Sequence, residues 1–320
     1  FDNQPVMDYL IQASNLVSEN LKKDDLVIYE STVYPGATEE VCIPCLSKSN
    51  LKLNEDFMVG YSPERVNPGD KKNTLTNIIK IVSGSNAIAT ECVNKLYGSI
   101  IHAGTYVAES IRVAEAAKVV ENVQRDVNIA LVNELFQLFS KLNISTKSVI
   151  NAAATKWNFM KVYPGLVGGH CIGVDPYYLL SKSESVGYLA DLITKSRKLN
   201  DAMSEFIFNE FLKFVVKNKI IKEDLSVALL GFTFKENTPD LRNTKVYDLY
   251  NLLVKNGFSV QVYDDVANEE EVMQRYGIKV VRKYDTNFDV ALLAVPHKNI
   301  LSYYAKCKKP IYDFKEALNK

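Results

Sequence analysis

The sequence has no excess of charge of either sign. Its 38 basic and 38 acidic side chains cancel to a formal net charge of zero. Proteins that bind nucleic acid or anionic membranes usually present a surplus of lysine and arginine to the phosphates. We therefore expect neither partner, and any phosphate group must be bound by a few local residues.

Long apolar runs are absent as well. Runs such as residues 227–230 and 290–295 fall far short of the ~20 residues that cross a bilayer. Five cysteines, an odd number without the spacing of a secreted disulfide framework, fit a reducing compartment. Three scattered histidines offer no metal site. The expectation is a soluble, cytoplasmic protein without a metal ion.

No Gly-x-Gly-x-x-Gly motif occurs in the 320 residues, although dinucleotide-binding strand–turn–helix units usually carry one. The chain starts at Phe1, without an initiator methionine or a signal peptide. These absences predict a chain that lacks its beginning.

Alternation of helix and strand dominates the first third of the chain. The patterns predict a helix over 6–22, a strand over 26–30, a helix opened by Pro35-Gly36, strands over 57–61 and 78–82, and a helix capped by Asn86. The length exceeds the ~250 to 300 residues at which single cores stop growing, so two or three domains are expected. Residues 1–105 are predicted to be the remaining part of an N-terminal nucleotide-binding domain.

One long helix is predicted over 108–142, because apolar residues keep helical spacing throughout. At about 50 Å this helix would be longer than one small domain is wide. We therefore expect it to bridge two domains and to pack against a partner subunit in a homodimer. A helix capped by Ser145 and helical periodicity over 189–217 complete a central helical domain, residues 106–218.

The C-terminal part, residues 219–320, has the pattern of a second open sheet. Strands are predicted over 225–230, 259–263, 278–281 and 290–295, with a helix over 244–255 between the first two. The fold class is therefore α/β, with two doubly wound, Rossmann-like parallel-sheet domains joined by a central helical layer that contains the long helix. Ligands of such sheets bind at the carboxyl ends of the strands.

Residues 163–178 contain Cys171 among four glycines and follow neither apolar period, so they predict a shaped loop. A cysteine acts as a nucleophile only as the thiolate, and exposed main-chain amides with a basic neighbour lower its pKa. The alternative for Cys171 is a small buried hydrophobe. Asp175, four residues on, is the second candidate, and its alternative is a turn before Pro176.

The long helix carries a polar stripe. Glu115, Lys118, Asn122 and Arg125 are spaced three, four and three residues apart and share one face. Spacing alone is also compatible with a solvated face bearing an ordinary ion pair.

Residues 168–178, Gly-Gly-His-Cys-Ile-Gly-Val-Asp-Pro-Tyr-Tyr, resemble the active-site loop of the UDP-glucose/GDP-mannose dehydrogenases. The similarity is to the branch that acts on UDP-N-acetylhexosamines. It extends, in family order, over residues 30–38, 61–69, 114–122 and 231–242. In this family a glycine-rich cofactor loop would precede Phe1, so the choice between NAD and NADP cannot be read from the chain.

The resemblance implies roles for individual residues. Cys171 would be the nucleophile, Lys118 and Asn122 would line the sugar and hold the C6 oxygen, and Glu64 and Asp175 would activate water. Ser31, Thr32, Val33 and Arg242 would contact the cofactor NAD. The remaining substrate contacts would be Lys161, Gly165, Phe234 and Lys235.

The activity that the resemblance implies is an NAD-dependent, four-electron oxidation at C6 of a UDP-N-acetylhexosamine, through a thiohemiacetal and a thioester of Cys171, for surface polysaccharide precursors. UDP-glucose members usually carry Phe-Pro-Lys where this chain has Ile172-Gly173-Val174, which favours an acetamido sugar. The sugar epimer stays open. So do three alternatives: a UDP-glucose 6-dehydrogenase, a non-catalytic UDP-sugar-binding module, and a hydroxyacid dehydrogenase without a covalent step.

Overall fold

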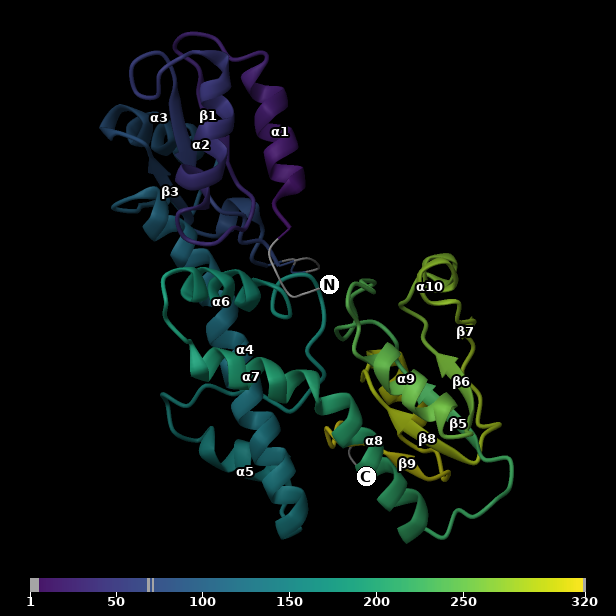
Figure 1. Cartoon of the computed structure of the whole chain (residues 1–320). Helices are drawn as coiled ribbons and strands as arrows, with labels where there is room; N and C mark the ends of the chain where they lie inside the picture. Colours follow the sequence, from purple (N-terminus) through teal and green to yellow (C-terminus); the bar gives the residue numbers. More distant parts are fainter. Residues whose placement is uncertain (1–5, 68–69, 71, 319–320) are drawn as a thin grey trace. The chain divides into compact units, whose positions relative to one another are not determined.

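The computed structural model describes residues 6–67, 70 and 72–318. The chain forms two compact units (Figure 1). Unit 1 comprises residues 1–124 and 174–190, and unit 2 comprises residues 125–173 and 191–320. The division into segments 1–105, 106–218 and 219–320 stays a prediction.

Unit 1 is built on a four-stranded sheet in the order β1-β2-β3-β4. Its strands are β1 (Leu26–Tyr29), β2 (Met58–Tyr61), β3 (Lys80–Gly84) and β4 (Thr105–Val107). The helices α1 (Asp8–Ser18) and α3 (Ala87–Gly98) confirm two predictions, and Asn86 caps α3 by accepting a hydrogen bond from the Ala89 amide. After the Pro35-Gly36 turn the chain forms a π-helix, Thr38–Cys42, and the short α2 (Ile43–Leu46) instead of one regular helix.

The sheet of unit 1 is not entirely parallel. β1 pairs with β2 and β3 with β4 in parallel, but β2 pairs with β3 antiparallel, with Tyr61 opposite Ser83. A parallel pair needs a long crossover connection, usually through a helix, whereas an antiparallel pair does not. In the described part of residues 62–79 the only helical element is the 3₁₀ turn Leu75–Asn77, so this connection lacks a crossover helix.

The long helix is α4 (Ile111–Leu142), which confirms the prediction. Its 32 residues correspond to a length of about 48 Å. Residues up to 124 belong to unit 1 and those from 125 onward to unit 2. The helix α6 (Asp175–Ser185), which belongs to unit 1, was not predicted.

The helices of unit 2 include α5 (Thr146–Ala153), α7 (Asp191–Asp201) and α8 (Met203–Lys217). The hydroxyl of Ser145 accepts a hydrogen bond from the Ser148 amide and caps α5, as predicted. The periodic segment 189–217 forms two helices that are separated at Ala202. Phe208 and Phe211 on α8 belong to the main hydrophobic core of this unit.

The sheet of unit 2 is parallel throughout, in the order β7-β6-β5-β8-β9. Its strands are β5 (Ser226–Leu230), β6 (Ser259–Tyr263), β7 (Val280–Val281), β8 (Val290–Leu293) and β9 (Ile311–Tyr312), and its helices are α9 (Val246–Lys255), α10 (Glu269–Tyr276) and α11 (Lys298–Tyr304). All four residues of β8 are buried, as expected for a central parallel strand covered on both faces. β9, α10 and α11 were not predicted.

None of the helices in the described part of the chain combines the length and the apolar character needed to cross a membrane.

Candidate active site

The glycine-rich loop around Cys171 is held by the segment that follows β5. The Gly169 amide donates to the carbonyl of Arg242 at 2.9 Å, and the Asn243 side chain donates to the carbonyl of Gly169 at 3.2 Å. A Cβ atom on Gly168 would lie 2.7 Å from the Asn243 carbonyl oxygen. Only glycine therefore allows this close approach of two main chains. The Cys171 side chain itself is exposed, so it is not the small buried hydrophobe of the alternative interpretation.

Arg242 provides positive charge near the thiol. Its guanidinium donates to both carboxylate oxygens of Asp240, at 3.0 Å from Nε to Oδ1 and 2.6 Å from Nη2 to Oδ2. This hydrogen bonding raises the pKa of Arg242, and the Cys171 thiol adds a smaller electrostatic contribution in the same direction. The guanidinium thus lies within electrostatic reach of the sulfur, and a neighbouring cation favours the thiolate.

Three of the four side chains in the polar stripe on α4 are buried, and Glu115 is fully so. Lys118 and Asn122 are 7% and 5% exposed, and Arg125 is exposed. The Asn122 amide donates to Asp175 Oδ2 at 2.5 Å, and Asp175 is the buried first residue of α6 and not part of a simple turn. Unit 1 therefore brings together two of the candidate site residues, Asn122 and Asp175, and their catalytic roles stay a prediction.

Lys118 differs from the other buried cations. No ion pair among the described residues includes it, although its side chain is almost fully buried. Burying an ammonium group without an anionic partner is costly. The position is consequently suited to accept an oxygen that carries or develops negative charge.

Glu115, the first member of the stripe, has a structural role. Its carboxylate accepts hydrogen bonds from the Gly36 amide at 2.5 Å and from the Thr38 amide and hydroxyl at 2.9 and 2.7 Å. Burial raises the pKa of Glu115, and these hydrogen bonds counteract the rise. The carboxylate therefore holds the turn that starts the Thr38–Cys42 π-helix.

Glu64 is held through both carboxylate oxygens. Oε1 accepts from the Val66 amide at 2.5 Å, and Oε2 lies 3.4 Å from Nζ of Lys80, which is itself buried and also 3.1 Å from Glu30. Burial by itself would raise the pKa of Glu30, but hydrogen bonds from Tyr97 and Lys80 outweigh it and lower the pKa. The side chain of Glu64 keeps about half of its surface accessible. Pro68 and Gly69 of the same motif lie outside the described residues.

The predicted cofactor residues Ser31, Thr32 and Val33 follow the carboxyl end of β1. Ser31 is exposed, and its carbonyl accepts a hydrogen bond from the Tyr61 hydroxyl at 3.0 Å. Val33 is 3% exposed and packs in the core of unit 1, so a ligand contact there would use its main chain.

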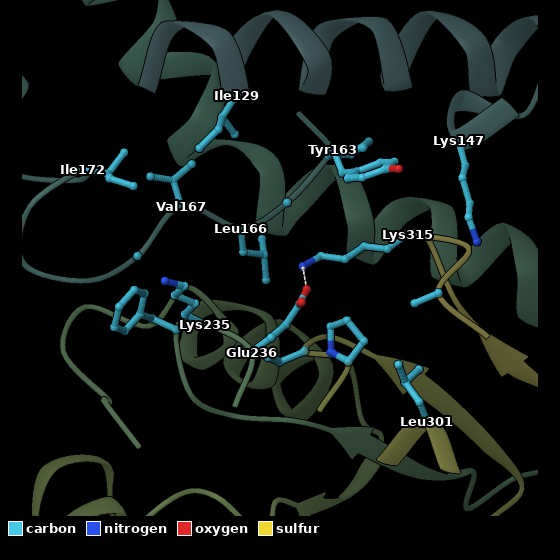
Figure 2. Close-up of a pocket in the computed structure, with 17 residues that line it drawn as sticks. Ile129, Lys147, Tyr163, Leu166, Val167, Ile172, Lys235, Glu236, Leu301 and Lys315 are labelled. Carbon is cyan, nitrogen blue, oxygen red and sulfur yellow. Dashed lines mark hydrogen bonds and ion pairs between the residues drawn. The ribbon is translucent and has the colours of Figure 1, made fainter. Parts of the chain in front are cut away.

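A cavity of about 540 Å³ lies within unit 2 (Figure 2), a size typical of small-molecule sites. Three predicted substrate residues line it: Gly165, Phe234 and Lys235. The fourth, Lys161, is not among the lining residues, and its ammonium lies 5.5 Å from the centre of the Tyr163 ring.

Sequence analysis missed Glu236 and Lys315, which also line the cavity. Their side chains point toward one another and form an ion pair at 3.3 Å, drawn as a dashed line in Figure 2. Glu236 is adjacent to a predicted residue, and Lys315 follows β9 at the carboxyl edge of the sheet. Recognition of β9 would therefore have pointed to Lys315.

Comparison with known proteins now adds to this geometry. Three family models match the chain in sequence: the NAD binding domain of the UDP-glucose/GDP-mannose dehydrogenase family over residues 2–101, its central domain over 112–202 and its UDP binding domain over 228–320. A UDP-N-acetyl-D-glucosamine 6-dehydrogenase of Salmonella typhi is 50% identical over 98% of this chain and 76% of its own length. The chain belongs to the UDP-glucose/GDP-mannose dehydrogenase family.

Two further proteins support this family membership. A UDP-N-acetyl-D-glucosamine 6-dehydrogenase of Pseudomonas aeruginosa is 49% identical, covering 99% of this chain and 77% of that protein. The solved structure of a UDP-D-ManNAc dehydrogenase from Pyrococcus horikoshii has a TM-score of 0.82 and 30% identity, covering 94% of this chain and 70% of that one.

The membership confirms the predicted family and fold class. This member is an NAD-dependent UDP-sugar 6-dehydrogenase, which binds a UDP-sugar as substrate. A non-catalytic module and a hydroxyacid dehydrogenase are therefore no longer alternatives.

Proposed function

We propose that this dehydrogenase oxidises the C6 alcohol of UDP-N-acetyl-D-glucosamine to the uronic acid, for surface polysaccharide precursors. The observation that carries the proposal is the 50% and 49% identity to two UDP-N-acetyl-D-glucosamine 6-dehydrogenases, against 30% to a UDP-N-acetyl-D-mannosamine dehydrogenase. Ile172-Gly173-Val174, in place of the Phe-Pro-Lys of UDP-glucose members, supports an acetamido sugar.

The exposed Ser31 and the half-buried Thr32 at the carboxyl end of β1 fit a dinucleotide, because open α/β sheets bind such ligands at this edge. Bound NAD would supply the hydride acceptor for two successive oxidations at C6, so two equivalents would be consumed per sugar. The hydroxyl of Ser31 and the main chain of Val33 are proposed to hold it, and Arg242 is proposed as a further contact.

Cys171 is proposed to trap the aldehyde that the first oxidation produces. The thiolate sulfur adds to C6, and the oxygen takes up a proton to complete a thiohemiacetal. Loss of a hydride and a proton converts this adduct to a thioester. The Arg242 guanidinium supports the role by favouring the thiolate, and the exposed loop supports it by leaving the sulfur accessible.

Lys118 and Asn122 are proposed to hold the C6 oxygen while negative charge develops on it. The Lys118 ammonium is buried, and no ion pair among the described residues includes it. This supports the role, because preorganised charge in a dry site stabilises an oxyanion strongly. In the last step water attacks the thioester carbon, and Glu64 or Asp175 accepts a proton from that water. The bond between C6 and the sulfur breaks, which regenerates the Cys171 thiolate and releases the carboxylate of the uronic acid. Asn122 would orient Asp175 through their 2.5 Å hydrogen bond.

The protein is further proposed to be a cytoplasmic homodimer. Its cysteines number five, an odd count without the spacing of a secreted disulfide framework, as suits a reducing compartment. Val113, Val120, Leu131 and Leu138 on α4 are each more than 40% exposed, and such side chains are suited to a subunit interface. A monomeric mass in light scattering at micromolar concentration would contradict the dimer.

The test compares UDP-N-acetylglucosamine with its galacto and manno epimers and with UDP-glucose. We expect the highest kcat/KM for UDP-N-acetylglucosamine and two NADH per uronic acid formed. Cys171→Ala should lower uronic acid formation by at least about 10³-fold, since it removes the nucleophile. Cys171→Ser should stall after aldehyde formation or accumulate an ester. A preference for UDP-glucose, or native turnover by Cys171→Ala, would refute the proposal.

A further inference from the structure

A buried polar cluster lies at the carboxyl edge of the sheet in unit 2. Thr233 follows β5, Asp264 directly follows β6 and His297 follows β8, and all three side chains are fully buried. β5 is the immediate neighbour of both β6 and β8, so the cluster joins the ends of three adjacent strands. None of these residues has a part in the mechanism above.

The hydrogen bonds define the tautomer of His297. The Asn237 amide, which can only donate, points at His297 Nδ1 at 2.9 Å, so Nδ1 must be the acceptor. A neutral imidazole then carries its proton on Nε2, which lies 3.0 Å from Asp264 Oδ2 and donates to it. Both ring nitrogens thus have specific partners.

Asp264 is itself anchored. Its Oδ2 also accepts from the Phe232 amide at 2.6 Å, and its Oδ1 accepts from the Val266 and Ala267 amides at 2.7 and 2.8 Å. Through Asp264, the imidazole of His297 is therefore oriented by the main chain that leaves β5 and β6. A ring held in this way has little freedom to turn.

The remaining partners of His297 belong to the loop that lines the cavity: the Asn237 amide at Nδ1, and the Thr233 hydroxyl, which lies 3.2 Å from Nε2. The Asn237 amide ends a short segment in which Thr233 Oγ1 donates to the Lys235 carbonyl at 2.8 Å, and the Asn237 side chain accepts from the Lys298 amide at 2.9 Å. Between these attachment points, Phe234, Lys235 and Glu236 face the cavity (Figure 2). His297 is fully buried and is not among the lining residues of the cavity, so it holds the loop without facing the cavity itself.

We infer that His297 is a positioning residue for UDP-sugar binding, which fixes the loop 233–237 so that Phe234 and Lys235 meet the nucleotide. The inference rests on the proposed function in that the cavity receives the UDP moiety. It assigns His297 no contact with substrate and no proton transfer. Its effect should appear in affinity and KM and leave the chemical step nearly unchanged.

The test uses three variants that distinguish the contributions of the hydrogen bonds at the two ring nitrogens. His297→Asn places its amide atoms at the distance of Nδ1 and can still accept from the Asn237 amide. His297→Gln reaches as far as Nε2 and can donate to Asp264, but it leaves the loop amide without an acceptor. His297→Leu removes both hydrogen bonds. Each variant is measured for Kd of UDP by calorimetry, KM and kcat for the UDP-sugar, and Tm.

We expect His297→Leu and His297→Gln to raise the Kd of UDP and the KM about tenfold, as befits the loss of one buried hydrogen bond, with kcat within about threefold. His297→Asn should recover most of the affinity. If His297→Leu does not fold, Thr233→Val replaces it, because this change removes the hydroxyl bond to the Lys235 carbonyl. A purely structural histidine would not separate Asn from Gln in affinity.

Asp289 offers a matched control at the opposite edge of the same sheet. Its Oδ2 accepts from the Ser226 amide at 2.9 Å and hydroxyl at 2.7 Å, joining the amino ends of β5 and β8. Asp289→Asn should lower Tm and leave the Kd of UDP and the KM unchanged.

If the three His297 variants lower Tm as Asp289→Asn does and keep the parent affinity for UDP, the inference is wrong. If the parent protein binds UDP but oxidises no UDP-N-acetylhexosamine, the proposed function fails while the UDP affinities still test His297.

Discussion

Two buried cations, Arg197 in unit 2 and Lys118 in unit 1, differ in whether an acidic side chain matches their charge. In unit 2, Arg197 is 3% exposed and pairs with the fully buried Asp126 at 2.6 Å. In unit 1, Lys118 is nearly as buried, but no ion pair of the described residues includes it. A buried charge that forms an ion pair within the protein contributes to the stability of the fold. A buried charge without such a pair is suited to bind an anionic group of a ligand.

The largest effect should come from Lys118→Met, which keeps the length of the side chain and removes the charge. We expect kcat to fall by about 10²- to 10³-fold, the usual cost of losing one group that stabilises an oxyanion. Thermal stability should stay the same or rise, because the variant no longer buries an ammonium group without a partner.

Arg197→Met is the counterpart in unit 2. It leaves the Asp126 carboxylate buried without its cation, and breaking such a pair costs about 3–5 kcal/mol of stability. Chemical denaturation measures the stability of Lys118→Met and Arg197→Met, and steady-state kinetics measures their kcat. The contrast between the units would fail if Lys118→Met were the more destabilised protein or if it kept native kcat.

The second prediction compares a thiol from each unit. Burial is the main cause that raises the pKa of Cys42 in unit 1 to about 11, so roughly one part in a thousand is thiolate at pH 8. Cys171 in unit 2 is exposed and near Arg242. We expect iodoacetamide to modify Cys171 at least about a hundredfold faster, and peptide mapping by mass spectrometry measures both rates.

Because Cys92 is exposed as well, Cys171→Ala is the control for total thiol loss. Bound UDP-sugar should slow modification of Cys171 and leave that of Cys92 unchanged. Equal rates at Cys42 and Cys171 would contradict the assignment of Cys171 as the accessible thiol.

The smallest effect concerns the ion pair in the cavity of unit 2. Lys315 is there matched by Glu236, and a nucleotide diphosphate would compete with that carboxylate for the ammonium. We expect Lys315→Met to raise the Kd of UDP by about three- to tenfold and Glu236→Gln to lower it about threefold, since partly exposed charges contribute about 0.2–1 kcal/mol or slightly more.

Uridine, which lacks the phosphates, distinguishes an effect on diphosphate binding from an effect on nucleoside binding. Its affinity should change little in either variant. If Glu236→Gln weakens UDP and uridine equally, the carboxylate contacts the nucleoside and does not compete for Lys315. Calorimetry with both ligands measures these affinities.

Sequence analysis recovered the elements that local patterns specify. Helical spacing of apolar residues predicted α4, and the side chains of Asn86 and Ser145 marked the starts of α3 and α5. The strands β1, β5 and β6 were recognised within two residues of their bounds. The two-residue strand β9 and the seven-residue helix α11 were missed because segments this short carry too few residues to show a period.

Other features depend on residues that are distant in the sequence. Lys80 meets Glu30 and Glu64 across three segments of unit 1, and His297 meets Asp264 and Asn237 across unit 2. Neither Lys80 nor His297 stands in a motif that sequence analysis recognised, so nothing local marked either residue. The antiparallel pairing of β2 with β3 likewise depends on the path of the segment that connects these two strands.

Local sequence was sufficient for the family, the long helix α4, the strands β1, β5 and β6 and the glycine loop of Cys171, because each depends on residues close together in the chain. The tertiary structure was needed to see that Lys118 is buried outside every ion pair of the described residues and that Lys315 and Glu236 meet in the cavity. Burial and hydrogen-bond partners are properties of packing between distant segments, and the free energy that tunes a charged group comes from that packing.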